Sequence, residues 1–436
     1  MCTDESEWNR DTEYATGECH GAREASLHSK AGDKIMAGIF SVPRDNGSCL
    51  VLIKNNLAHN LEDSNPLASF GAHENIQVFD IPMGDQSVND ALIPFLMSRQ
   101  IIGGAGCVLS SGEYCYSQRG LMMEYGWGNN TTHNRSMISG HRESHTGSYT
   151  QSRRLHIITG DSNMLEYQTW LKLAITNIIV AMMETSASVQ FGYSLKRVAL
   201  PDDKIREQIA IEMADVSRDF INHGRTPLIT LGDGSLVSAY DLQARYWEAA
   251  DKFVRKARFE SERWEQETKE AMSAWQSILH AIYRNDTDYL EGRLDHTTKY
   301  VVIREYLKRT GKDLFQYPSL LAEKHTFDVM YHRLPISGSN APTLFERIRN
   351  HYKSRMLFSD AEIDQAVENP PQKTRAFMRG KCAATLHGLK KQGRLDGSSI
   401  LNWDSLSYQG ARFEIADPLM YKKDGFETFL HKIEVS

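Results

Sequence analysis

The sequence predicts an α+β fold in which helices pack on an antiparallel sheet, followed by a small C-terminal domain. Residues 153–158 alternate between apolar and other side chains, which is the period of a strand with two different faces. Three long stretches are predicted to be helices: 165–183, 203–220 and 241–283. Pro370 and Pro371 then interrupt the chain before its last part. A chain of 436 residues is long enough for two domains, and we expect them at 1–355 and 356–436.

The elements before residue 153 are predicted from apolar spacing and from turn residues. A helix is expected over 22–40, and two short apolar strands are expected over 49–53 and 74–83. The loop between these strands is rich in Asn, Ser and Pro, which favours an antiparallel hairpin. A further helix is expected over 88–100. The run Gly103–Gly106 then indicates a flexible break, and it lacks the lysine of a phosphate-binding loop.

The stretch from Arg153 to Met164 carries the strongest indication of function. His156 lies on the predicted strand beside two arginines, and the strand leads into a polar turn and the start of the 165–183 helix. Arginine side chains and helix N-termini favour anions. A neutral imidazole can bind a divalent metal. The alternative interpretation is a core histidine next to two surface arginines.

Composition excludes several classes of partner. Apolar residues make up 41% and charged residues 24% of the chain, as in an ordinary soluble globular protein. A net charge of −6 argues against a nucleic-acid surface. The six cysteines form no C-x-x-C pair, which favours a reduced, cytoplasmic protein. The N-terminal residues resemble no signal peptide, and the most apolar run, 173–183, is too short to span a membrane.

Several runs, taken together and in order, resemble one known family. The stretch 153–164 resembles the R-R-L-H-hydrophobic-G-D-S-N-M signature of the Pup ligase and depupylase (Dop) family, whose members are related to glutamine synthetase and to carboxylate–amine ligases. Other matching runs are Glu13–Cys19 (E-Y-A-T-G-E-C), Lys30–Met36 (K-A-G-D-K-I-M), Lys54–Asn56, Ser69–Asn75, Ser98–Gln100, Ser117–Arg119, Leu294–Lys299, Phe327–His332 and 366–380. The resemblance extends from about Glu13 to about Leu419.

The resemblance implies a glutamine-synthetase-like antiparallel sheet packed by helices, with ATP and magnesium as cofactors. It implies Pup, a small disordered ubiquitin-like protein, and pupylated proteins as partners, with a functional link to the bacterial proteasome. The run Trp403-Asp404-Ser405 and the run 366–371 favour the depupylase branch, which hydrolyses the isopeptide bond between the C-terminal glutamate of Pup and a substrate lysine. The run 114–119 looks like that of the ligase, which forms this bond through a glutamyl phosphate. A catalytically inactive relative that binds Pup or nucleotide is the third alternative.

The same resemblance implies roles for individual residues. The predicted metal ligands are Glu13, His156, Glu18 and Glu74, and the predicted nucleotide-binding residues are Arg119, Arg154 and Asn56. Family members begin with a G-[IL]-E-T-E-Y strand and carry an aspartate shortly before the first motif glutamate, and nothing before Glu13 matches either feature. Glu7 and Asp11 are the predicted catalytic substitutes for this aspartate. For the runs 294–299 and 327–332, helix capping and surface ion pairs are an equally good interpretation.

Overall fold

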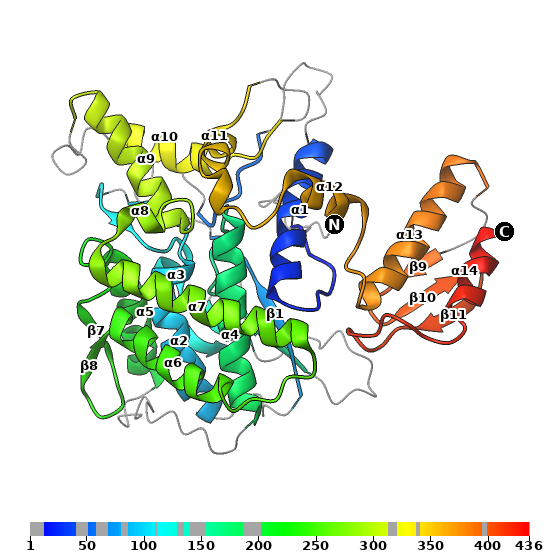
Figure 1. Cartoon of the computed structure of the whole chain (residues 1–436), viewed down its shortest axis with the longest axis horizontal. Helices are drawn as coiled ribbons and strands as arrows, with labels where there is room; N and C mark the ends of the chain where they lie inside the picture. The colour runs from blue at the N-terminus through cyan, green and yellow to red at the C-terminus, as the bar shows by residue number, and fades with distance from the viewer. Residues whose placement is uncertain are drawn as a thin grey trace.

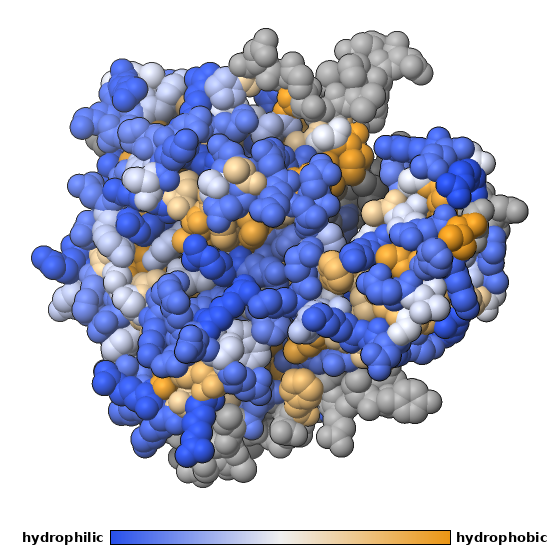
Figure 2. Space-filling view, turned by 45° about the vertical axis from the view of Figure 1, so that its right-hand side comes forward, coloured by the Kyte–Doolittle hydropathy of each residue, from blue (hydrophilic) through white to orange (hydrophobic). Residues whose placement is uncertain are grey.

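The structure is a computed structural model, and it describes residues 13–40, 51–57, 69–79, 86–109, 111–128, 135–139, 153–185, 202–312, 321–336, 341–394 and 399–435. None of the helices in these ranges combines the length and apolar character that crossing a bilayer requires. Hydrophilic residues cover most of the face seen in Figure 2, and apolar residues appear there in small separate groups.

A sheet of four strands lies at the centre of the large unit in the described part of the chain. Its order is β1 (Glu74–Val78), β6 (Arg153–Ile157), β5 (Ser136–Ser139) and β4 (Tyr125–Gly128). β6 pairs antiparallel with both β1 and β5, whereas β4 is parallel to β5. Two short hairpins accompany it, β2 (Cys107–Val108) with β3 (Tyr114–Cys115), and β7 (Pro227–Thr230) with β8 (Leu236–Ser238). The α+β class predicted from the sequence is confirmed.

Helices form the rest of the large unit and cover one face of the sheet (Figure 1). They are α1 (Ala22–Phe40), α2 (Gln86–Ser98), α3 (Gln100–Gly103), α4 (Glu166–Thr185), α5 (Asp202–Arg218), α6 (Ala239–Val254), α7 (Glu262–Arg284), α8 (Thr287–Leu290), α9 (Asp295–Arg309), α10 (Leu321–Tyr331), α11 (Leu344–His351) and α12 (Asp360–Glu368). The hydroxyls of Ser238 and Ser261 cap α6 and α7 by accepting from backbone N–H groups in the first turn. The predicted helix over 241–283 is therefore two helices, each with its own cap.

Two local predictions are wrong. β1 does not pair with residues 51–53, the described part of the predicted partner strand: its five residues pair with β6, and Ile53 forms an isolated antiparallel bridge with Arg333. Loop composition favours the nearest strand in sequence, but pairing with β6 places Val78 in the same apolar core as Leu155 and Ile157. The Gly103–Gly106 run is buried rather than a flexible break, and Gly106 adopts a φ of 71°, which a side chain would strain.

The C-terminal unit has its own small core. It contains α13 (Arg375–Lys391), the sheet of β9 (Ser399–Leu401), β10 (Ser405–Tyr408) and β11 (Ala411–Glu414), and α14 (Phe426–Glu434). Buried apolar residues of these elements form a cluster separate from the core of the large unit. α12 instead packs on α1, and the segment after α12 leads across to the C-terminal unit (Figure 1).

Candidate functional site

The central sheet has one apolar face and one polar face. Leu155 and Ile157 of β6 point into the main core, so Arg154 and His156 point to the opposite side. On the neighbouring strand, Asn75 lies directly opposite His156 and Gln77 directly opposite Arg154. We use the term polar face for the surface made by Asn75, Gln77, Arg154, His156 and Ser139, the last of which pairs with His156 from β5.

Contacts within the polar face are electrostatic and aromatic. Arg154 Nη1 donates to Asn75 Oδ1 at 3.3 Å. The rings of His73 and His156 meet edge to face, with their centroids 4.8 Å apart. His156 is buried, while Arg154 is partly exposed. A guanidinium held at the rim of a buried imidazole suits the recognition of an anionic group.

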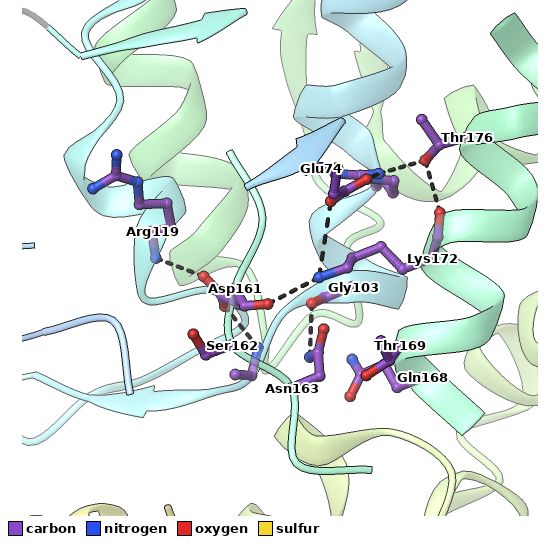
Figure 3. Close-up of polar contacts among 12 residues, drawn as sticks. Glu74, Gly103, Arg119, Asp161, Ser162, Asn163, Gln168, Thr169, Lys172 and Thr176 are labelled. Carbon is purple, nitrogen blue, oxygen red and sulfur yellow. Dashed lines mark hydrogen bonds and ion pairs between the residues drawn. The ribbon is translucent and has the colours of Figure 1, made fainter. Parts of the chain in front are cut away.

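Glu74 lies on the other face of the sheet. Its two carboxylate oxygens accept from Arg99 at 2.7 and 2.8 Å, and Lys172 Nζ lies 3.8 Å away (Figure 3). Arg99 and Glu74 are both about 3% exposed as side chains, so this is a buried ion pair between the sheet and the helical layer. The predicted pairing of Glu74 with His156 in one metal site is therefore corrected: the alternation of β1 and β6 separates the two side chains.

The turn after β6 brings several distant segments together. Asp161, which is 2% exposed, accepts from the backbone N–H groups of Ala105, Gln118 and Arg119 at 2.7, 3.0 and 2.7 Å. It also accepts from the Ser117 hydroxyl at 3.0 Å. Burial raises the pKa of Asp161, although these hydrogen bonds act in the opposite direction. Lys172 Nζ donates to the Asp161 carbonyl oxygen at 2.9 Å, which fixes the turn to α4 (Figure 3).

Two of the predicted nucleotide-binding residues belong to this same structural centre. Asn56 is fully buried; its side chain donates to the Phe70 carbonyl and accepts from the Ser162 N–H at 2.7 and 2.6 Å. Arg119 is 1% exposed and donates to the carbonyl oxygens of Ile158 and Ser69. Burial and the nearby Arg135 lower the pKa of Arg119 to about 10. Of the three predicted residues, only Arg154 lies on the polar face.

A second buried network ties α9 and α10 to the same turn. Asp295 accepts from the N–H groups of Met164 and Leu165, just before α4 begins, so it caps that helix from a distant segment. Lys299 Nζ lies 2.5 Å from Asp328 and 2.9 Å from His332 Nε2. Burial, followed by the Lys299 charge, lowers the pKa of His332 well below its usual value. The surface ion pair considered for these runs is wrong, since Lys299 and Asp328 are 1% and 0% exposed.

The remaining predicted residues are placed as follows. Glu13 is exposed at the start of the described chain, and Glu18 forms ion pairs with Arg375 and Arg379 of α13. The predicted catalytic residues Glu7 and Asp11 lie outside the described residues. Among the residues that are described, no three His, Cys, Asp or Glu side chains are grouped to hold a metal ion. Magnesium requires oxygen ligands, and the polar face as defined offers amides, a hydroxyl and an imidazole but no carboxylate. The described donor set therefore does not fit a magnesium site.

Sequence reasoning missed the residues that hold the site together. The sequence motifs predict no role for Asp161, Arg99 or Lys172. One signal was available for Lys172, because it is a lone charge inside an otherwise apolar stretch of helix. The partners of Asp161 could not have been found this way, since they lie 42 to 56 residues away along the chain.

The comparisons with known proteins agree along nearly the whole chain. Residues 7–407 match the family model described as Pup-ligase protein. The Pup–protein ligase of Geodermatophilus obscurus is 30% identical over 383 residues, which cover 85% of this chain and 75% of the relative. The enzyme of the same name from Mycolicibacterium smegmatis is 30% identical over 380 residues, with the same coverage.

Two solved structures are similar to this fold. The structure of the Pup ligase PafA in complex with ADP superposes with a TM-score of 0.79 at 26% identity, and covers 97% of this chain and 86% of that chain. The complex between Pup and its ligase PafA gives a TM-score of 0.78 at 26% identity, over 96% and 80% of the two chains. The signature runs, the buried turn that they build and these matches lead to one conclusion: the chain belongs to the Pup-ligase protein family.

Proposed function

We propose that this protein is an ATP-dependent ligase that joins the C-terminal glutamate of Pup to a lysine of a substrate protein. The observation that carries the proposal is the family match over residues 7–407, together with relatives that are named as Pup–protein ligases. Support for a nucleotide comes from the similar PafA structure in complex with ADP, and support for Pup as partner comes from the PafA–Pup complex. The preference for a depupylase, drawn from Trp403–Ser405 and residues 366–371, receives no such support.

The chemistry is phosphoryl transfer followed by amide formation. The terminal phosphoryl group of ATP passes to the glutamate carboxylate, ADP leaves, and the lysine amine then attacks the acyl phosphate with loss of phosphate and a proton. Catalysis of this kind depends mainly on positioning and on neutralising negative charge. We assign the charge-neutralising role to Arg154, because it is the arginine of the predicted set that lies on the polar face. Magnesium stays a prediction.

Adjacent arginines on β6 provide the test. Arg154 and Arg153 are neighbours, but they alternate to opposite sides of the strand, and Arg153 pairs with Val78. We expect Arg154→Ala to lower kcat/KM for conjugate formation by about 100-fold. A loss of this size is typical when one hydrogen-bond donor to a charge in the transition state is removed. Arg153→Ala is the matched control and should retain activity. Equal losses in the two variants would exclude a specific role for Arg154.

A second arm of the same experiment separates ligase from depupylase. The wild-type protein is incubated with Mg²⁺, ATP, Pup ending in glutamate and an acceptor protein, and in parallel with a purified Pup–protein conjugate. The proposal predicts a new conjugate in the first reaction. Release of free protein in the second reaction, without conjugation in the first, would establish the depupylase instead. Binding of Pup and nucleotide without either product would identify an inactive relative.

A further inference from the structure

The carboxylate of Glu18 is held by two arginines of the C-terminal unit. Its Oε1 accepts from Arg375 Nε at 2.8 Å, and its Oε2 accepts from Arg379 Nη2 at 2.7 Å. The side chains of Glu18 and Arg375 are 17% and 2% exposed, so this contact is largely shielded from water. Burial alone would raise the pKa of Glu18, but the charges of Arg379 and Arg375 outweigh it and the pKa is lowered. Both oxygens are therefore already engaged by cations.

Further contacts fix the same segment to α13. The Thr374 hydroxyl donates to the backbone carbonyl of Glu18 at 2.5 Å. Gly17 lies so close to α13 that a methyl group there would be 3.0 Å from Ala376 Cβ. Arg375 also donates to the carbonyl of Ala416 at 3.2 Å, so it connects residue 18 to the chain that follows β11. Because side chains and backbone both contribute to these contacts, residues 17 and 18 are held more firmly than an isolated surface ion pair would hold them.

The other end of the segment is fixed to the large unit. Tyr14 packs against a small apolar core that contains Met164 and Leu165, the last residues of the turn after β6. Its ring lies against α1, where a methyl group added at Gly32 would be 2.2 Å from Tyr14 Cε1. Residues 13–18 therefore run from the buried turn to the C-terminal unit, with Glu13 exposed beside Tyr14.

We propose that Glu18, Arg375 and Arg379 form a positioning clamp, through which the C-terminal unit sets the position of residues 13–18. In this assignment Glu18 is not a metal ligand. The clamp attaches the C-terminal unit, which has its own core, to the large unit at residues 17 and 18. The effect on conjugation rests on the proposed ligase function, whereas the effect on the segment itself does not.

Three variants and one control test the clamp. Glu18→Gln removes the charge with the same shape, Arg379→Gln removes one partner, and the double variant removes both. Lys381→Gln is the control, because it lies on the same helix and its contact is an exposed pair with Glu427 at 3.9 Å. We expect each single variant to lower kcat by about 10- to 100-fold with little change in KM for Pup. The double variant should be no worse than the poorer single variant, and Lys381→Gln should match wild type.

A cysteine probe reports on the segment without any need for activity. Cys19 follows Glu18 and is partly exposed, whereas Cys382 is buried in the C-terminal core. Alkylation of each thiol is followed by site-resolved mass spectrometry. The clamp predicts faster alkylation of Cys19 in both single variants while Cys382 stays protected. If Arg379→Gln exposes Cys382, Arg379→Lys decides the question, because it keeps the charge and should restore slow alkylation of Cys19.

Other results would overturn the proposal. Unchanged Cys19 alkylation in both single variants would show that the segment is held without the clamp. Loss of activity in Glu18→Gln but not in Arg379→Gln would mean that Glu18 acts directly on nucleotide or metal. If the wild-type protein forms no conjugate, the proposed ligase function fails, and the Cys19 rates alone still decide whether the clamp exists.

Discussion

Replacement of Asp161 by asparagine should remove a large part of the stability of the protein. The carboxylate receives four donors, three backbone N–H groups and one hydroxyl, and it is 2% exposed. An asparagine presents an NH₂ group in place of one oxygen, so two of these donors would face another donor. Each buried donor left unsatisfied costs about 1–3 kcal/mol, or about 2–6 kcal/mol for the two. Burial raises the pKa of Asp161, so removing its charge offsets part of this cost.

The net expectation is a loss of about 1–5 kcal/mol, against a total stability of about 5–15 kcal/mol for a typical protein. Urea unfolding of the wild type and of Asp161→Asn measures this difference as a shift of the midpoint at constant slope. Asp251→Asn is the matched control, because it removes only an exposed pair with Arg255, and such pairs contribute little to stability. A loss below 1 kcal/mol for Asp161→Asn would refute the view that this turn organises the fold.

Three further predictions concern buried and strained positions. Lys299→Met should lower the free energy of unfolding in urea by about 3–5 kcal/mol, because it leaves Asp328 buried without its cation. The double variant Lys299→Met with Asp328→Leu should be more stable than Lys299→Met alone, and a less stable double variant would contradict this. Burial lowers the pKa of His296 in the folded protein from the usual 6.5 to about 3. Between these two pH values the imidazole is therefore neutral in the folded protein but protonated in the unfolded chain. Stability should therefore fall as the pH drops below 6.5, with up to about 1.4 kcal/mol per pH unit from this residue, and unfolding curves of His296→Phe should have a flatter pH dependence. Gly106→Ala should lower the melting temperature by more than Gly234→Ala. Both glycines have a positive φ, but a methyl group at residue 106 would lie 2.2 Å from the nearest atom, whereas one at residue 234 would face open space. Equal melting temperatures of the two variants would contradict this prediction.

Elements set by local spacing were predictable from the sequence, and strand pairing was not. The helix over 22–40 agrees in both bounds with α1, and the strand at 153–158 corresponds to β6. The predicted partner of 74–83 was wrong because hairpin reasoning favours the neighbour in sequence, whereas β6 follows β1 by 75 to 83 residues along the chain. Long-range pairing of this kind depends on the packing of the whole core, and the sequence of the loop between the strands does not indicate it.

Of the candidate site, the shared face of Arg154 and His156 follows from the sequence, whereas the positions of the other motif residues do not. The motif residues His156 and Arg154 do share one face, because alternation along a strand is visible in the sequence. Asn56 and Arg119 instead hold the turn after β6, since a buried turn needs side chains to satisfy its polar atoms. The run Trp403–Ser405 favours the hydrolase by its resemblance, yet it leads into β10, which starts at Ser405, and Trp403 lies under Arg379 in the C-terminal unit. These residues therefore belong to the C-terminal unit and not to the polar face.

The central claim is that this protein couples ATP hydrolysis to formation of an isopeptide bond with Pup. The most direct test measures ADP and conjugate in the same reaction of the wild-type protein with Mg²⁺, ATP, Pup ending in glutamate and an acceptor protein. The account predicts one ADP for each conjugate formed, and no conjugate when ATP is omitted. Absence of conjugate and of ADP in this reaction, together with release of free protein when a purified Pup–protein conjugate is supplied instead, would contradict it and establish the hydrolase.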